Sequence, residues 1–174
     1  MRVTSPWSTD ENLSPTDRDR LERLGQILEE AQAEYEFLFS AETVTSAEDG
    51  VVQGFGRLAS MAPTFLLQTE WGWLCAIISG ETRLAYKKIR KQLGVKDVAL
   101  ARPDIVFQVT GARPGSMALV NTGFVTIIDQ RLTLMDSIYG GCGVPQYTLH
   151  MGVRDLIAVT QAQVFDFAEP KTAV

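Results

Sequence analysis

The sequence predicts an α+β fold in which helices surround a mixed sheet or closed barrel. Three observations support this class. Helical and strand-like patterns alternate irregularly, the second half is rich in short strands and glycine, and 174 residues, 45% of them hydrophobic, suffice for one core. A regular alternation would instead indicate a doubly wound sheet.

The N-terminal part is expected to contain a tail and one helix. Residues 1–14 are polar and are expected to form a disordered tail. Ser14 can cap a helix that begins at Pro15, with Asp17 in its first turn. Apolar residues then recur at helical spacing: Leu21, Leu24, Ile27 and Leu28. We therefore expect a helical extension over residues 15–34.

One domain is expected over residues 35–170, built from short elements. A helix starts at Thr45 or Ser46, each followed three residues later by an acidic residue. Two apolar runs on either side of residues 69–72 indicate a β-hairpin. Further helices are expected over 82–93, 103–110 and 153–159. Further strands are expected over 35–39, 98–101, 117–120, 124–128, 137–139, 146–150 and 164–167.

Composition excludes several classes of protein. The longest apolar run, over residues 71–79, is too short for a membrane-spanning helix, which needs about 20 residues. The first residues lack the apolar region of a secretion signal, so we expect a cytoplasmic protein. Two cysteines and one histidine do not suit a zinc or His-rich centre. No Walker-type or Gly-x-Gly-x-x-Gly loop is present, and we expect neither metal nor cofactor.

The net charge of -5 hides an asymmetry along the chain. Residues 1–50 contain 12 acidic and 4 basic side chains, whereas residues 51–174 contain 9 and 12. The basic residues cluster within one short segment: Arg83, Lys87, Lys88, Arg90, Lys91 and Lys96. Such a cluster either attracts phosphate or is simply a solvated helix face.

Nucleophilic catalysis has few candidate residues. His150 would have to be the base of a Ser-His-Asp triad, yet its alternating surroundings favour an ordinary strand residue. Cys142 has no base near it in the sequence. Two glycine-rich loops, over 110–117 and 140–143, can direct backbone N–H groups at a ligand oxygen, or can serve as tight connections between strands.

The order of several short motifs resembles the YbaK family, also called the prolyl-tRNA-synthetase-associated editing domain. The resemblance extends over residues 35–168. It rests on an apolar hairpin, a Lys-rich helix ending in Leu93-Gly94, Val98–Ala101, Val109-Thr110-Gly111 with Gly115, Val125–Asp129, Gly140-Gly141 and Asp155-Leu156.

The resemblance implies a barrel-like α+β domain that hydrolyses mischarged aminoacyl-tRNA in trans. By position, Gly115, Ser116 and Met117 correspond to the catalytic glycine loop. Substrate-binding positions correspond to Thr64, Tyr139, Gly140, Gly141 and Gln146. The basic segment, with Arg83, Lys87, Lys88 and Lys91, would contact the tRNA acceptor end. The implied partners are aminoacyl-tRNA and an aminoacyl-tRNA synthetase.

The sequence also departs from the family pattern. The family's lysine before the first core strand is Thr64 here, and its Ser-Pro is Ala118-Leu119. Its acidic residue after the glycine pair is Gln146, and the polar residue before that pair is Tyr139. Threonine cannot supply the positive charge of a lysine, although Arg57 is near in sequence.

Two hypotheses follow from these departures. One is a deacylase with an altered site. The other is a non-catalytic relative that binds a small ligand, aminoacyl-tRNA or a protein partner. An arginine pointing into the pocket would favour the first hypothesis. A pocket filled by Trp71, Trp73 or Met117 would favour the second.

Overall fold

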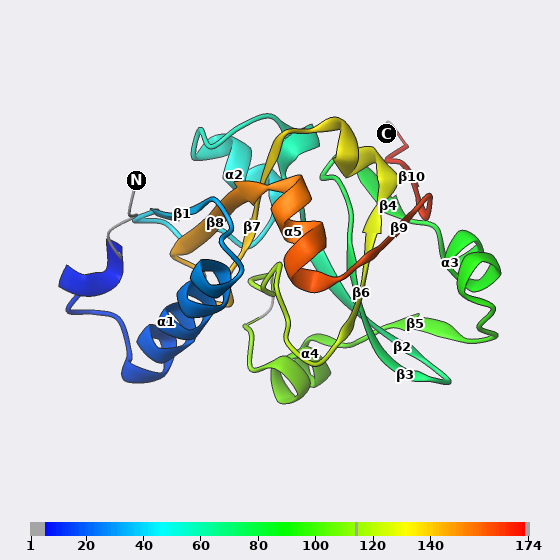
Figure 1. Cartoon of the computed structure of the whole chain (residues 1–174), viewed down its shortest axis with the longest axis horizontal. Coiled ribbons are helices and arrows are strands. Elements are labelled where there is room, and N and C mark those ends of the chain that lie inside the picture. The colour runs from blue at the N-terminus through cyan, green and yellow to red at the C-terminus, as the bar shows by residue number, and fades with distance from the viewer. Residues whose placement is uncertain (1–5, 114, 173–174) are drawn as a thin grey trace.

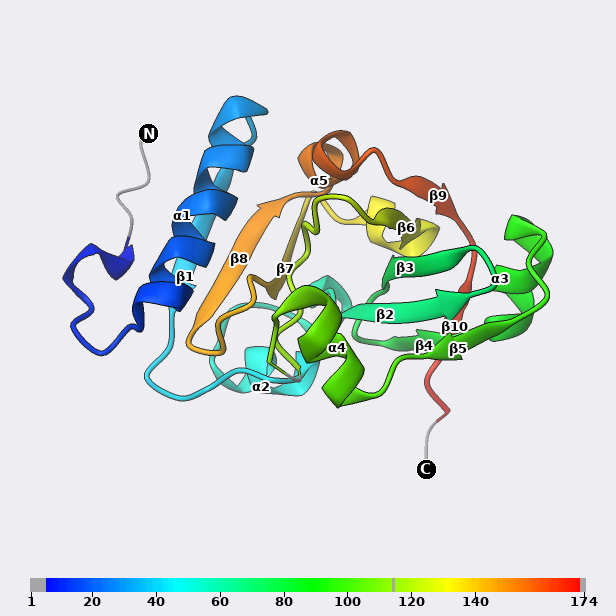
Figure 2. The same ribbon diagram turned by 90° about the horizontal axis from the view of Figure 1, so that it is seen from below.

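The computed structural model describes residues 6–113 and 115–172, and within them it has three sheets flanked by helices (Figures 1 and 2). The five-stranded sheet has the order β5-β2-β3-β6-β9, the three-stranded sheet has the order β1-β8-β7, and β4 pairs with β10. The strands are β1 Tyr35–Phe39, β2 Thr64–Thr69, β3 Gly72–Ile77, β4 Thr82–Leu84, β5 Val98–Leu100, β6 Val125–Asp129, β7 Ser137–Gly141, β8 Tyr147–Gly152, β9 Gln163–Phe165 and β10 Ala168–Pro170. The helices are α1 Pro15–Glu30, α2 Ala47–Val52, α3 Tyr86–Leu93, α4 Pro103–Thr110 and α5 Val153–Thr160, with 3-10 turns η1 Pro6–Thr9, η2 Leu58–Ser60 and η3 Gln130–Leu134.

The five-stranded sheet is mixed, which confirms the predicted fold class. β2 pairs antiparallel with β3 and β5, whereas β3 pairs parallel with β6, and β6 with β9. The described strands stay in three separate sheets and do not close into a barrel. No described helix has the length and apolar character needed to cross a membrane.

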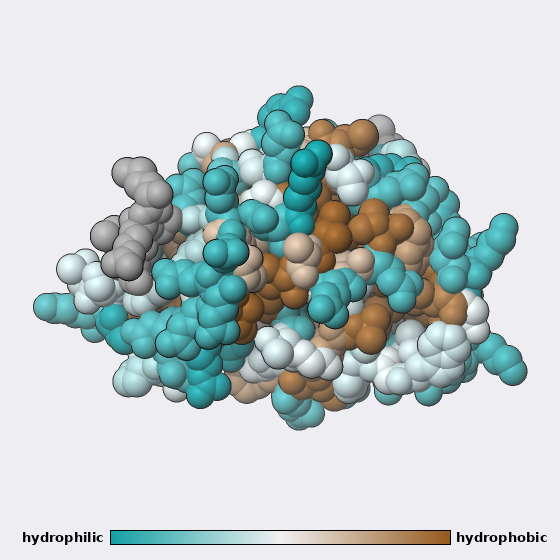
Figure 3. Space-filling model, viewed as in Figure 1, coloured by the Kyte–Doolittle hydropathy of each residue, from teal (hydrophilic) through white to brown (hydrophobic). Residues whose placement is uncertain are grey.

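Both faces of the five-stranded sheet are buried. Along β3, Leu74 and Ala76 belong to a cluster completed by Ile89 of α3, whereas Cys75 points to the opposite cluster with Met117. A third cluster joins α1 and α5 to the three-stranded sheet. Strands buried on two faces read as continuous apolar runs rather than as alternating ones, which is why β3 is uniformly apolar. Apolar side chains also reach the surface over the middle of the face in Figure 3.

Local sequence signals explain most element boundaries. The Ser14 hydroxyl accepts a hydrogen bond from the Asp17 amide, and Pro15 opens α1 as predicted. Of the two candidate starts of the next helix, Ser46 is the cap of α2. Gly111 takes a left-handed conformation with φ 73° and ends α4.

Two predicted elements are wrong in type. Residues 82–84 are strand rather than helix, because β4 pairs with β10 at the other end of the chain. Residues 117–120 are not a strand. Their one ladder contact is a bridge between Ala118 and Gly141, and the Ala118 carbonyl accepts a hydrogen bond from the Asn121 side chain at 2.6 Å instead of from a neighbouring strand.

Part of the segment expected to be a disordered tail is packed in the structure. Trp7, in η1, is 3% exposed and lies edge-on to Phe37 with ring centroids 4.7 Å apart. The Tyr147 hydroxyl donates to Asp10 at 2.8 Å, which fixes the following residues as well. Residues 1–5 of the expected tail lie outside the described residues.

Replacing Trp7 with alanine is expected to lower the free energy of unfolding by about 3–5 kcal/mol, because a buried indole and its ring contacts are lost. Urea denaturation would measure the loss. Trp71→Ala is the matched control: Trp71 is 71% exposed, and its removal should change stability by less than about 0.5 kcal/mol. Equal effects of the two variants would show that η1 does not contribute to the core.

Candidate functional site

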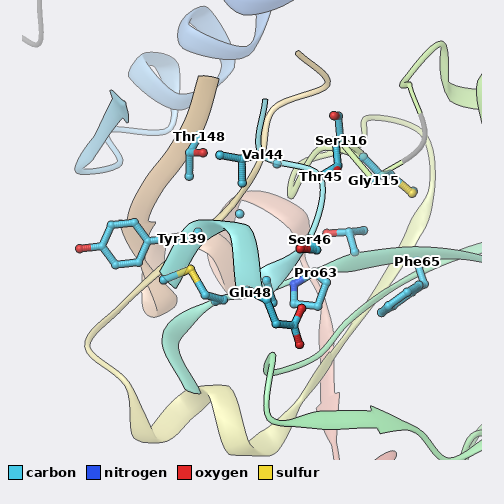
Figure 4. Close-up of a pocket in the computed structure, with 18 of the residues that line it drawn as sticks. Val44, Thr45, Ser46, Glu48, Pro63, Phe65, Gly115, Ser116, Tyr139 and Thr148 are labelled. Atoms are coloured by element: carbon cyan, nitrogen blue, oxygen red, sulfur yellow. The ribbon is translucent and has the colours of Figure 1, made fainter. Parts of the chain in front are cut away.

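One cavity of about 400 Å³ lies where α2, the start of β2, α4 and both glycine-rich loops meet (Figure 4). Its walls are mostly apolar, with Val44, Met61, Pro63, Leu66 and Met117 among them. Hydroxyl groups are interspersed between these apolar side chains: Thr45, Ser46, Thr64, Ser116, Tyr139 and Thr148. Such a cavity suits a mostly apolar ligand held by a few polar contacts.

Most residues that the sequence singled out as catalytic or substrate-binding line this cavity. The set comprises Thr64, Gly115, Ser116, Met117, Tyr139, Gly140 and Gly141. Gln146 is not part of the lining. It precedes β8, where its carbonyl accepts a hydrogen bond from the Ser40 amide at 2.9 Å. Pro114 of the first glycine-rich loop lies outside the described residues.

Several contributors to the cavity escaped sequence reasoning. Among them are the segment over 44–48, Thr148 of β8 and Lys171 near the C-terminal end of the described chain. Capping residues predicted a helix start at Thr45 or Ser46, but no sequence signal placed that helix beside Gly115. In Figure 4 the Thr45 and Gly115 labels lie side by side, and a Cβ on Gly115 would collide with the Thr45 carbonyl oxygen.

The two glycine-rich loops are bound to each other by backbone hydrogen bonds. The Leu119 amide donates to the Gly141 carbonyl at 2.9 Å, and the Gly143 amide donates to the Ser116 carbonyl at 2.7 Å. A Cβ on Gly141 would collide with the Met117 carbonyl oxygen, so this approach requires glycine. These glycines therefore serve as tight connections and at the same time form the cavity wall.

Two buried hydroxyl groups in the cavity have no hydrogen-bond partner among the described residues. They are the Oγ of Ser116, a residue 2% exposed, and the Oγ1 of Thr64. Leaving a buried polar group unpaired costs about 1–3 kcal/mol, and such groups in native proteins call for an explanation. A bound ligand that hydrogen-bonds to both hydroxyls would remove this cost.

Helix α1 holds the first glycine-rich loop in place. The Arg20 guanidinium donates to the Thr110 and Gly111 carbonyls at 3.2 and 3.0 Å, where α4 ends. Asp17 forms an ion pair with Arg113 at 2.8 Å. A cation at a helix C-terminus is also favoured by the helix dipole. The acidic N-terminal helix thus packs on its own domain and anchors the loop that carries Ser116.

His150 lies outside the cavity, although its surroundings have the order of a triad. Its Nδ1 is 2.7 Å from a Glu36 carboxylate oxygen, and its Nε2 is 2.9 Å from the Ser137 hydroxyl. None of these three residues lines the cavity. The imidazole instead stacks on Tyr139, with ring centroids 4.1 Å apart, and so supports the cavity wall.

The Cys142 thiol is not an activated nucleophile. Burial raises its pKa to about 12, so the reactive thiolate is scarce at neutral pH. The thiol donates a hydrogen bond to the Tyr147 carbonyl at 3.1 Å, as a structural residue would.

The basic segment does not line the cavity, and its cations divide into two kinds. Arg83 forms an ion pair with Glu169 at 2.8 Å, and Lys88 with Asp166 at 2.9 Å. Lys87 and Lys91 are exposed and form no ion pair with another described residue. These two remain the most available cations of α3.

The two features expected to separate the hypotheses, an arginine in the pocket and a pocket filled by large apolar side chains, give a mixed result. Arg57 is exposed and does not line the cavity, and no other arginine among the described residues does. Trp71 and Trp73 do not line it either, whereas Met117 does. The cavity is therefore open to a ligand, and its one lining cation in the described chain is Lys171.

Comparison with known proteins gives a family and a fold. The sequence model of the aminoacyl-tRNA editing domain matches residues 41–159. The chain is similar in structure to a hypothetical protein, APE2540, with TM-score 0.79 and 22% identity over 84% of this chain and 99% of that one. It is also similar to a candidate trans-editing enzyme for prolyl-tRNA synthetase, with TM-score 0.78 and 23% identity over 90% of this chain and 99% of that one. A search of curated proteins finds no match.

Replacing Gly141 with alanine is expected to lower the free energy of unfolding by about 1–3 kcal/mol, because the new Cβ would push apart the paired loops. Chemical denaturation would measure this change. Gly25→Ala is the matched control. Gly25 lies within α1, and a Cβ there would be at an ordinary contact distance, 3.7 Å, from the Tyr35 hydroxyl. That variant should be unchanged or more stable by about 0.5–1 kcal/mol. A Gly141→Ala protein as stable as Gly25→Ala would contradict the close approach of the loops.

Proposed function

We infer that this chain, which belongs to the aminoacyl-tRNA editing domain family, hydrolyses the ester bond of mischarged aminoacyl-tRNA in trans. The resemblance to the YbaK family found in the sequence is confirmed by the family match and by the shared fold. The observation that carries the proposal is the pair of unpartnered hydroxyls, Ser116 and Thr64, in an otherwise apolar cavity.

An aminoacyl ester is already activated, so its hydrolysis needs position and charge stabilisation more than a strong base. In our proposal the ester carbonyl lies against the Ser116 and Thr64 hydroxyls, which donate hydrogen bonds as negative charge develops on its oxygen. Water attacks the carbonyl carbon, and the bond to the ribose oxygen then breaks. Of the two protons of the water, one goes to the ribose oxygen and restores the tRNA hydroxyl, and the other goes to solvent, so the amino acid leaves as a carboxylate.

The apolar walls would select the amino acid by size, as a second editing sieve does. Met61, Pro63, Leu66 and Met117 would surround the side chain. The exposed Lys87 and Lys91 would attract the phosphates of the acceptor end, whereas Arg83 and Lys88 are engaged in ion pairs and would contribute less. An aminoacyl-tRNA synthetase is the protein partner that such a trans-acting activity suggests, and the cytoplasm is the compartment.

Ser116→Ala is expected to lower kcat about 100- to 1000-fold, the effect of removing one donor to a developing oxyanion, with a smaller change in KM. Deacylation of a panel that includes alanyl- and cysteinyl-tRNA for proline would measure it. Ser137→Ala is the matched control, because its hydroxyl bonds His150 outside the cavity, and its rate should be that of the wild type. If Ser137→Ala abolished turnover and Ser116→Ala did not, His150 would be the base and the proposal would be wrong.

Thr64→Lys restores the positive charge that the family carries at this position, and it separates the two hypotheses. An active wild type whose rate rises in Thr64→Lys would indicate a deacylase that works without the family lysine but benefits from it. A wild type inactive on the whole panel, with activity gained only in Thr64→Lys, would indicate a ligand-binding relative whose pocket is intact. No deacylation by either protein would contradict a deacylase function for these substrates.

A further inference from the structure

Lys171 and Glu48 are the two charged side chains among the described residues that line the cavity. The Lys171 ammonium lies 2.9 Å from a Glu48 carboxylate oxygen. Their side chains are 46% and 59% exposed, so the pair sits at the mouth, whereas the unpartnered hydroxyls are buried. The cavity thus has opposite charges at its entrance and uncharged groups inside.

The fold brings these two residues together from opposite ends of the domain. β10 pairs with β4, with Pro170 opposite Thr82, and the Lys171 amide donates to the Glu81 carbonyl at 3.0 Å. The adjacent turn contacts the first turn of α2, since a Cβ on Gly80 would lie 2.9 Å from the Ala47 Cβ. The backbone of the C-terminal segment is therefore held beside Glu48.

The ion pair can open at little cost to the protein. An ion pair between two half-exposed side chains contributes little to stability, because water solvates both charges well. Lys88 differs, since its ammonium also donates to the Ala168 carbonyl at 3.2 Å. The hydrogen bond from Lys171 lowers the pKa of Glu48, so the carboxylate stays charged at neutral pH.

We propose that the Lys171–Glu48 pair recognises a ligand that carries both a phosphate and a primary ammonium, with Lys171 binding the phosphate and Glu48 the ammonium. This inference rests on the proposed function, because an aminoacyl-tRNA ester has an α-ammonium beside the scissile bond and a phosphodiester on its terminal nucleotide. The two charges of the resting protein neutralise each other and are exchanged for the two charges of the substrate. Lys171, which directly follows β10, then supplies the positive charge that Thr64 lacks.

Binding of a non-hydrolysable ligand tests the pair separately from catalysis. The probe is 3′-alanylamido-3′-deoxyadenosine 5′-phosphate, in which an amide replaces the ester. Two analogues of this probe each lack one charge: one has no phosphate, and the other has an acetylated amino group. Isothermal titration calorimetry would measure the binding of the three ligands to the wild type and to the Lys171→Met and Glu48→Gln variants. The control variant is Arg23→Ala, which removes another exposed ion pair, that of Arg23 with Asp19 on α1.

On wild type and Arg23→Ala, loss of either charge from the ligand should weaken binding about 10- to 100-fold, the effect of one charge-assisted hydrogen bond. Lys171→Met should abolish the dependence on the phosphate and keep the dependence on the ammonium, and Glu48→Gln should do the reverse. This crossed pattern is a double-mutant cycle, so a general loss of structure cannot mimic it. Both variants should unfold at the same urea concentration as wild type.

The outcomes separate this inference from the deacylase function. Charge-dependent binding that follows the crossed pattern, in a protein that hydrolyses none of the esters tested, would support the inference and overturn the activity. Hydrolysis by a protein whose Lys171→Met variant keeps the full dependence on phosphate would overturn the inference alone. No binding of the charged probe to wild type, or equal binding of all three ligands, would also overturn it.

Discussion

The site depends on one backbone contact, the pairing of residues 116–119 with residues 141–143. This contact joins the loop after α4, which is outside the named strands, to the end of β7 in the three-stranded sheet. The Ser116 carbonyl is occupied by the Gly143 amide, and Gly140 lies against the Leu119 side chain. Where backbone lies against backbone there is no room for side chains, so this part of the cavity wall is formed by the main chain.

Polarity is distributed unevenly in the cavity. The unpartnered hydroxyls of Ser116 and Thr64 are buried, and leaving such groups unpaired costs about 1–3 kcal/mol. Charges cannot be treated in the same way, because desolvating them costs far more than desolvating a hydroxyl. The exposed positions of Glu48 and Lys171 agree with this distinction, and the cavity becomes less polar from its entrance inward.

Sequence patterns predicted the elements whose ends carry strong local signals. α4 lies where Pro103 and Gly111 placed it. The hairpin of β2 and β3 turns over Glu70-Trp71, directly before Gly72, whose φ is 115°. Residues 117–120 were predicted to be a strand because an apolar run is typical of strands. In the structure this segment contacts Gly141 through one bridge and forms no longer ladder. Strand β4 was mistaken for the start of a helix because its partner β10 lies 80 and more residues away.

The candidate site was predicted in part, for a related reason. Glycine-rich motifs identify loops that approach a ligand or one another, so Gly115 and Gly140 were found. In the sequence Glu48 is notable only as the acidic residue three positions after Thr45, and Lys171 carries no motif. Their relation arises from a pair of short strands and a contact at Gly80, and no periodicity or spacing encodes contacts of this kind. The role of Arg20 was likewise invisible, since a helix surface of mixed charge normally indicates only solvation.

The position of Arg20 has a consequence for where this domain begins. The family match starts at residue 41, after α1 and β1, yet Arg20 and Asp17 hold both ends of the loop that leads to Ser116. β1 is moreover paired along its whole length with β8. The packed domain thus extends beyond the residues that the family model matches. A chimera or a truncated version cut at the family boundary would lose Asp17, Arg20 and β1. The Thr110 and Gly111 carbonyls and the Arg113 guanidinium would then be exposed to water, together with the edge of β8.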